Sequence, residues 1–152
     1  MIHYEHIPNN VYEYIQEVKQ ALYCDTNIIF AYLFGGLAKG VQKPLSDIDI
    51  ATYVRDTNNI AEYTMNLFLT LSDICHTSEI DIVILNTAPE SLVGRIMHHK
   101  MLLVDKEPFF RHTFESLALR KYFDFAIKEK QILYRRYKIG RYASDSSQIV
   151  GA

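Results

Sequence analysis

Two aspartates separated by one residue, Asp47 and Asp49, follow a glycine pair at Gly35 and Gly36 in a chain of 152 residues. Residues two apart in a strand project to the same face, so these carboxylates would lie side by side. Their mutual repulsion is relieved by a cation, and oxygen ligands of this kind suit Mg²⁺. Glycines allow a tight turn and offer backbone N–H groups to a phosphate. The pattern therefore indicates phosphoryl or nucleotidyl transfer.

A third aspartate opens another strand-like segment with a similar signature, Asp81-Ile82-Val83-Ile84. If that strand neighbours the one carrying Asp47 and Asp49, the three carboxylates lie on one rim and could hold two divalent ions about 4 Å apart. Asp81 could also accept the proton of an attacking hydroxyl. A lone aspartate at a strand start is more often a turn residue. Three of them, two at a fixed distance from a glycine pair, favour a metal site.

The loop between the glycines and the aspartates carries further candidates. Lys39 could reach a triphosphate as a point charge, with an exposed loop lysine as the alternative interpretation. Ser46 is a further candidate for nucleotide binding, with a turn residue as the alternative. Favourable interaction with a helix C-terminus explains a second basic cluster without a function: Arg95, His98, His99 and Lys100. Because adjacent helix residues diverge by about 100°, His98 and His99 form no joint metal site.

Hydrophobic periodicity predicts the elements that must position these residues. Helices are expected over residues 10–23, 60–76, 89–100 and 109–138, and strands over 28–34, 47–54, 79–85 and 101–104. The first strand is apolar throughout and therefore central in a sheet. Gly140 is expected to end the last helix. This order predicts an α+β fold in which amphipathic helices cover a small mixed β-sheet.

Length and composition fit one globular domain. The chain is 49% hydrophobic and 22% charged, which is enough to bury a core. We expect a single domain over residues 1–142 and a flexible tail over 143–152. No apolar run approaches the roughly 18 residues that cross a bilayer, and no signal-peptide core opens the chain. With no disulfide pattern at Cys24 and Cys75, a cytoplasmic protein without a membrane partner is expected.

The net charge of −2 hides an asymmetry. Residues 1–119 carry 8 Lys/Arg and 15 Asp/Glu, whereas residues 120–142 carry 8 Lys/Arg and 2 Asp/Glu. A basic helix on an acidic body indicates an anionic partner, with a solvated face as the alternative. The last helix also holds more aromatics than one buried stripe needs, and we expect most in the core and the surplus in a protein interface. Basic–aromatic interleaving also suits RNA, but a protein partner is favoured and direct RNA binding is not expected.

These spacings resemble the DNA polymerase β-like nucleotidyltransferase superfamily, whose pattern is Gly-Ser, ten residues, then Asp-x-Asp. The spacing is matched here by Gly35, position 36, ten intervening residues and Asp47-Ile48-Asp49. Asp81 fits the third carboxylate. The match spans roughly residues 28–104. The short single-domain chain looks like the minimal nucleotidyltransferases, which include MntA-type antitoxins encoded beside HEPN-domain RNase toxins.

The resemblance implies a polymerase β-like core and transfer of a nucleoside monophosphate from a nucleoside triphosphate, with two Mg²⁺ ions. For the antitoxin branch it implies transfer of AMP from ATP to a tyrosine of the HEPN toxin. The residues to which the resemblance gives a role are nucleotide-binding Gly35 and Gly36, and catalytic, metal-binding Asp47, Asp49 and Asp81. Lys39 and Ser46 are expected beside them as nucleotide-binding residues of the loop.

One departure from the pattern is Gly36, which stands where the motif has serine. The glycine keeps a backbone N–H but loses a hydroxyl donor, and a hydrogen bond to a charged group contributes about 1.5–3 kcal/mol. We therefore expect weaker nucleotide binding or slower transfer. Two alternatives stand beside the transferase. One is an antitoxin that occludes its toxin through the basic helix, and the other is an antibiotic-modifying nucleotidyltransferase, against which the lack of a second domain argues.

Overall fold

The computed structural model describes residues 11–35 and 48–144, with side chains over 13–35 and 48–136. Its elements in chain order are α1 (Val11–Cys24), β1 (Ile28–Phe34), β2 (Ile48–Val54), α3 (Ile60–Cys75), β3 (Ile80–Ile84), α4 (Glu90–His98), β4 (Lys100–Asp105) and α5 (Pro108–Ser144). Every helix and strand expected from the sequence has a counterpart among them.

The four strands form one mixed sheet in the order β3-β2-β1-β4. β1 pairs antiparallel with both β2 and β4, and β2 pairs parallel with β3. The first six residues of β1 are buried, as expected of an apolar central strand covered on both faces. The predicted α+β fold, with a small mixed sheet covered by helices and a long C-terminal helix, is therefore confirmed.

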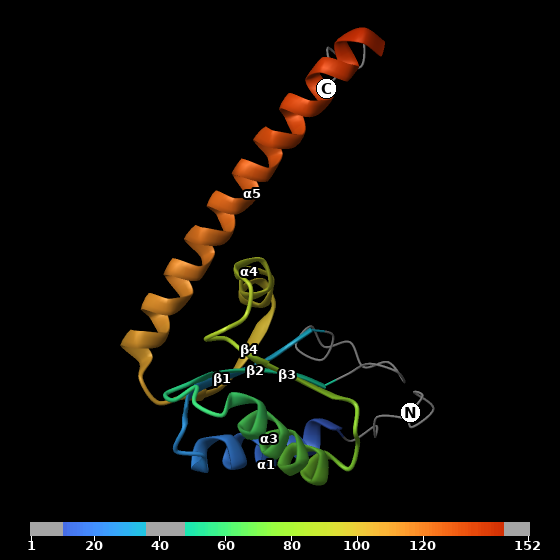
Figure 1. The fold of residues 1–152 in the computed structure, drawn as a ribbon. Coiled ribbons are helices and arrows are strands. Elements are labelled where there is room, and N and C mark those ends of the chain that lie inside the picture. Colours follow the sequence, from blue (N-terminus) through green and yellow to red (C-terminus); the bar gives the residue numbers. More distant parts are fainter. Residues whose placement is uncertain (1–10, 36–47, 145–152) are drawn as a thin grey trace.

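Alternating side chains divide the sheet into two faces, with helices on each (Figure 1). On one face Ile48 and Ile50 join the core formed with α1 and α3. On the other face Ala51 packs with residues of α4 and α5. Because successive strand residues point to opposite faces, Asp49 shares the α4–α5 face with Ala51. That face carries the candidate site.

A close helix–helix contact at Gly94 holds α5 against α4. A Cβ at this position would collide with the ring of Tyr122. Ala118 is buried in the same cluster, and the ring of His98 meets that of Tyr122 edge-on, with centroids 5.4 Å apart. α4 thereby fixes the direction in which α5 leaves the sheet.

The first turns of α5 are anchored to the sheet by a polar network. Arg111 lies 2.9 Å from Asp105 and 3.0 Å from Glu115, and the hydroxyl of Tyr32 donates a 2.6 Å hydrogen bond to Glu115. Burial opposes ionisation of Glu115, but the Tyr32 hydroxyl and the Lys100 charge outweigh it and lower the pKa of the carboxyl. Arg111 acts in the same direction. Burial and the bond to the carboxylate raise the pKa of Tyr32, so the network joins an ionised Glu115 to a protonated phenol.

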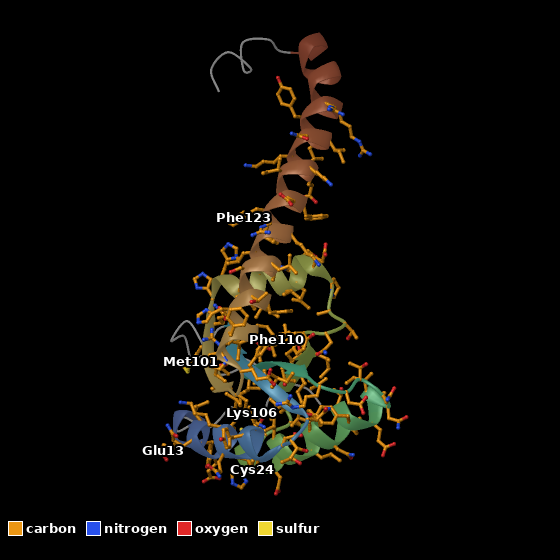
Figure 2. All side chains as sticks on the ribbon, turned by 90° about the vertical axis from the view of Figure 1, so that its left-hand side faces the viewer. Glu13, Cys24, Met101, Lys106, Phe110 and Phe123 are labelled. Carbon is orange, nitrogen blue, oxygen red and sulfur yellow. The ribbon has the colours of Figure 1, made fainter. Side chains whose placement is uncertain are left out.

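Beyond its contact with α4, α5 projects away from the rest of the molecule (Figure 1). The helix has 37 residues and is about 55 Å long at 1.5 Å per residue. From Phe123 (Figure 2) onward the helix presents large apolar side chains to solvent, with Phe123, Ile127 and Tyr134 exposed by 54%, 54% and 61%. Despite these side chains, no helix within the described ranges is apolar over a length that would cross a membrane.

The aromatic side chains of α5 differ from their expected placement. The prediction that most of them pack in the core is wrong, because five are exposed: Phe109, Phe110, Phe123, Phe125 and Tyr134. The helix outruns the surface of α4 and the sheet, which explains the exposed aromatics far from its start. Phe109 and Phe110 lie instead in its first turn, where Phe110 still meets the rings of Phe30 and Tyr53.

α5 also ends later than predicted, at Ser144 rather than at about residue 138. Gly140 lies inside the helix and does not end it. An internal glycine costs about 1 kcal/mol relative to alanine, which does not stop a helix whose flanking residues favour it. Ala143 and Ser144, assigned to the flexible tail, therefore belong to α5, and residues 145–152 lie outside the described part.

Candidate functional site

β2 and β3 hold Asp49 and Asp81 side by side. The two residues are register partners in the parallel strand pair. Their side chains therefore project to the same face from strands about 4.8 Å apart. Asp49 is partly buried and Asp81 is exposed. The pair thus has one carboxylate fixed against the sheet and one open to a molecule arriving from solvent.

The backbone turns at Gly35, directly after β1, with a φ of 74°. Residues with a side chain rarely adopt this conformation. A Cβ here would also collide with Oδ2 of Asp49 and would lie 3.2 Å from its Cγ. The register explains the closeness, because Phe34 at the end of β1 is the partner of Asp49. Only glycine lets the chain pass this near to the carboxylate.

The other predicted site residues lie outside the described part of the chain: Gly36, Lys39, Ser46 and Asp47. Their assignment to nucleotide or metal binding stays a prediction. The three that are described, Gly35, Asp49 and Asp81, meet where β1 ends and where β2 and β3 begin.

The described donors suit a hard divalent cation. Asp49 and Asp81 offer carboxylate oxygens, which are the ligands that Mg²⁺ prefers. Among the described side chains, those of residues 13–35 and 48–136, no cluster of three or more His, Cys, Asp and Glu forms a metal site. The pair supplies two of the three predicted ligands, and Asp47, the third, is not among the described residues. The donor chemistry therefore fits Mg²⁺.

A row of side chains crosses the sheet at the level of the two carboxylates. The register partners run from β3 to β4 in the order Asp81, Asp49, Phe34 and Lys100. The ammonium group of Lys100 lies 3.7 Å from Glu115 and 5.5 Å from the ring centroid of Tyr32. Its charge is thus directed to the start of α5.

A pocket of about 220 Å³ opens beside Gly35, between the end of β1 and α4. Its lining combines apolar and basic side chains: Phe34, Gly35, Leu92, Arg95, Ile96 and His99. The last four recur at i, i+3, i+4 and i+7, which is the spacing of one helix face. We call this site the Arg95 pocket.

The interpretation of Arg95 and His99 as helix-terminus charges missed the Arg95 pocket. Their spacing with Leu92 and Ile96 is the signal that could have found it. The expected divergence of the two histidines is observed. His98 packs against Tyr122, whereas His99 lines the pocket.

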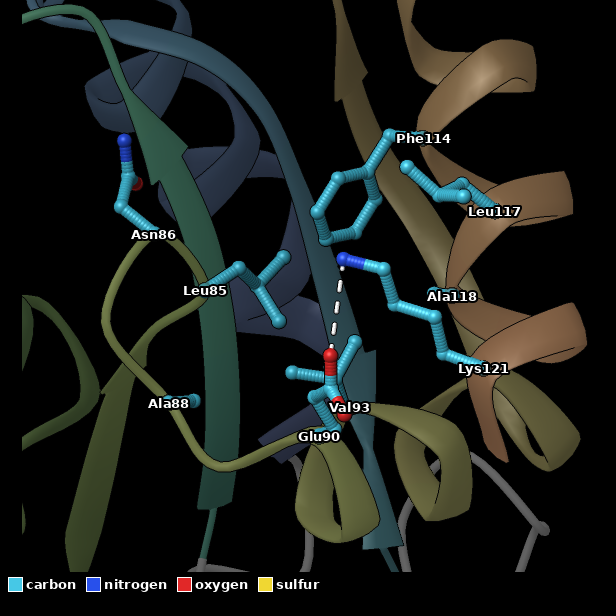
Figure 3. Close-up of a pocket in the computed structure, with 9 residues that line it drawn as sticks. All are labelled: Leu85, Asn86, Ala88, Glu90, Val93, Phe114, Leu117, Ala118 and Lys121. Atoms are coloured by element: carbon cyan, nitrogen blue, oxygen red, sulfur yellow. Dashed lines mark ion pairs between the residues drawn. The ribbon is translucent and has the colours of Figure 1, made fainter. Parts of the chain in front are cut away.

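A second pocket, also of about 220 Å³, lies between the end of β3, α4 and α5 (Figure 3). The ion pair of Glu90 and Lys121, with 3.5 Å between Oε2 and Nζ, joins the two helices at this pocket. The amide of Asn86 is already satisfied by the backbone N–H and carbonyl of Val54. Leu85 in its wall is four residues along the chain from Asp81, or about 13 Å. This pocket is therefore separate from the carboxylates.

The sequence matches a family model described as Polymerase beta, Nucleotidyltransferase over residues 16–109, which is more than half of the chain. That range contains β1 to β4, and hence Gly35, Asp49 and Asp81. No curated protein matches the sequence significantly.

Solved structures share the fold. A chain in a toxin–antitoxin structure with AMP-PNP is 23% identical, with a TM-score of 0.64 over 82% of this chain and 97% of that one. A structure of the tri-AMPylated Shewanella oneidensis HEPN toxin in complex with MNT antitoxin gives 21% identity and a TM-score of 0.63, over 84% and 98% of the two chains. A structure of the toxin–antitoxin MntA-HepT gives 21% and 0.59, over 86% and 99%. At these sequence identities the similarity establishes a shared fold and nothing further.

Proposed function

Because the chain belongs to the polymerase β nucleotidyltransferase family, we propose that it transfers AMP from ATP to a tyrosine of a cognate HEPN RNase toxin and so acts as its antitoxin. The observation that carries the proposal is the pair of register partners, Asp49 and Asp81, with Gly35 packed against the first carboxylate. A strand pair of this kind is suited to chemistry on a phosphate because it concentrates negative charge that a divalent cation must neutralise.

In the proposed reaction the phenol oxygen of the toxin attacks the α-phosphorus of ATP. A P–O bond forms to tyrosine, the bond between the α-phosphorus and the bridging oxygen breaks, and pyrophosphate leaves. Asp81 is exposed and accepts the phenolic proton. Asp49, held by Gly35, keeps a fixed position beside the triphosphate. Mg²⁺, held by Asp47, Asp49 and Asp81, would supply positive charge that lowers the pKa of the phenol and screens the triphosphate.

The choice of nucleotide and acceptor is supported by the structural neighbours. The solved structures with the same fold include a toxin–antitoxin with AMP-PNP and an AMPylated HEPN toxin bound to an MNT antitoxin. The exposed apolar side chains of α5 also supply a surface suited to a protein partner. We therefore favour a protein acceptor over a small molecule.

The proposal is tested by incubating the protein with Mg²⁺, ATP labelled at the α-phosphate and the HEPN-domain protein encoded beside it. We expect label on the HEPN protein, and its loss when the acceptor tyrosine is changed to phenylalanine. Absence of label from the HEPN protein and from any other acceptor in the reaction rejects the proposed transfer.

A second candidate is an antitoxin that silences its toxin by binding alone. The long, exposed and basic α5 favours it, as does the missing serine hydroxyl at Gly36. Asp49→Ala combined with Asp81→Ala separates the two candidates, because it removes the carboxylates and leaves α5 intact. Loss of toxin neutralisation by the double variant supports transfer, whereas full neutralisation supports binding alone.

A further inference from the structure

Arg95 differs from the basic side chains around it because no acidic side chain among the described residues pairs with it. Lys100 lies near Glu115, Arg111 near Asp105, and Lys121 near Glu90. Arg95 is exposed in the last turn of α4 and makes no ion pair or hydrogen bond with a residue that the structure describes. Its guanidinium group is therefore available to an anion that enters the Arg95 pocket.

The pocket lies on one particular side of the carboxylates. Gly35 belongs to its lining and also packs against Asp49. Phe34, which also lines it, is one strand from Asp49 and two strands from Asp81. At about 4.8 Å per strand, Phe34 is about 5 Å from Asp49 and about 10 Å from Asp81. The pocket therefore opens on the side of Asp49 that faces away from Asp81.

This side is where the leaving group of the proposed reaction must go. In phosphoryl and nucleotidyl transfer the attacking and leaving oxygens stand roughly in line on opposite sides of the phosphorus. If Asp81 accepts the proton of the attacking hydroxyl, pyrophosphate departs in the opposite direction, towards β1 and α4. We infer that Arg95 binds the β- and γ-phosphates of ATP and the pyrophosphate released from it, an inference that rests on the proposed function.

The chemistry of arginine suits this role. Its planar guanidinium presents paired N–H donors that match two phosphate oxygens, and it stays charged at all working pH values. His99 lines the same pocket and adds a ring nitrogen. The serine hydroxyl that the family pattern aims at a triphosphate oxygen is missing at Gly36. Arg95 thus supplies donors in the pocket that Gly35 lines, and Gly35 directly precedes that position in the sequence.

The test compares binding of three probes by the full-length protein: ATP, inorganic pyrophosphate and AMP, each with Mg²⁺. In Arg95→Ala we expect about a ten- to hundredfold weaker affinity for ATP and pyrophosphate, as for loss of a charge-assisted contact, with AMP binding unchanged. Arg95→Lys keeps the charge but lacks the paired N–H donors. Its affinity for ATP and pyrophosphate should lie between those of Arg95→Ala and the wild type. Arg120→Ala, at an exposed position on α5, is the matched control and should bind all three probes as the wild type does.

The alternative outcomes are distinct. Equal weakening of ATP and AMP, with pyrophosphate unaffected, would assign the pocket to the base or ribose and overturn the inference, as would unchanged ATP binding in Arg95→Ala. Neither result bears on the transfer reaction, which the labelling experiment tests separately. If ATP binding depends on Arg95 but no label reaches the HEPN protein, the inference stands and only the proposed transfer fails. A wild-type protein that binds neither ATP nor pyrophosphate overturns both.

Discussion

The contact between Gly35 and Asp49 makes the candidate site sensitive to a single methyl group. Gly35→Ala places a Cβ against the carboxylate and requires a left-handed backbone that costs an alanine roughly 1–2 kcal/mol. A displacement of about 1 Å can lower a rate about a hundredfold. We expect label transfer to fall by about that factor while the variant stays folded, as judged by circular dichroism.

Asn66→Ala is the matched control. Asn66 is exposed on α3, which packs on the other face of the sheet from the carboxylates. We expect this variant to bind ATP and to transfer label as the wild type does. Gly35→Ala with undiminished transfer would show that the position of Asp49 does not matter for the reaction.

The two cysteines give a test of burial that does not depend on function. Cys24 is exposed and Cys75 is buried. Burial, with a smaller contribution from Glu17, raises the pKa of the Cys75 thiol to about 11. Since thiolates are the reactive form, we expect a thiol reagent at pH 8 to label one cysteine per chain quickly and the second only after denaturant is added. Equal labelling rates in the native protein would contradict the packing of α3 against the sheet.

Single residues were predictable from the sequence where a local pattern specifies them. The alternation in Asp-Ile-Asp-Ile and Asp-Ile-Val-Ile is enough to give Asp49 and Asp81 the same face once their strands are neighbours. The function of Arg95 could not be read in this way. Its pocket exists only because α4 lies beside the end of β1, and a contact between segments about 60 residues apart has no local signature.

Among the elements, α5 depends on the polar network at its start. Glu115 has a lowered pKa, so its ionised form contributes stability that is complete above the unfolded-state value of about 4.3 and is lost as pH falls below it. Glu115→Gln removes the charge that Tyr32 and Arg111 contact. We expect it to destabilise the protein by about 1–3 kcal/mol at pH 7, measured by denaturant unfolding.

The difference between wild type and Glu115→Gln should shrink as pH is lowered from 5 to 3, because the wild-type carboxyl is then protonated. Glu129→Gln, an exposed position on the same helix, is the control and should have no effect. A difference that stays constant over this pH range would show that the charge of Glu115 does not stabilise α5.

Element types followed from hydrophobic periodicity, but their ends and outer contacts did not. The continuous apolar run of β1 marked a central strand. The prediction that α5 ends at Gly140 is wrong because a glycine within a helix costs only about 1 kcal/mol and does not by itself stop the helix. Its aromatics were misplaced because periodicity identifies a face without saying whether another element covers it.

In the whole molecule, the part of α5 from Phe123 onward is the surface best suited to bind the proposed partner. Phe123, Ile127 and Tyr134 are exposed and recur at i, i+4 and i+11, on one face of the helix. Replacing all three with serine should weaken binding of the HEPN protein at least tenfold, while ATP binding is retained. Affinity measured by surface plasmon resonance checks this.

The matched control changes Met65 and Leu69 to serine. These side chains are each 56% exposed and lie on α3, on the opposite side of the sheet. Partner binding should be unaffected. If the α3 double variant loses binding and the α5 triple variant keeps it, the partner docks on the other face of the molecule, away from the carboxylates.

The charge asymmetry was legible in the sequence before any fold was known, since 8 Lys/Arg and 2 Asp/Glu fall within residues 120–142. The sequence did not show that this segment projects away from the rest of the molecule. Projection depends on how far α4 extends beneath α5, which is set by tertiary packing at Gly94 and Tyr122.

The most direct measurement is the rate at which the protein transfers labelled AMP to the HEPN protein when Asp81 is changed to asparagine. Loss of a proton acceptor and cation ligand should slow transfer by about 10²- to 10⁴-fold. Asp73→Asn, at an exposed position on α3, should transfer at the wild-type rate. Transfer by Asp81→Asn at the rate of Asp73→Asn would contradict the account, because the carboxylate beside Asp49 would then have no part in the reaction.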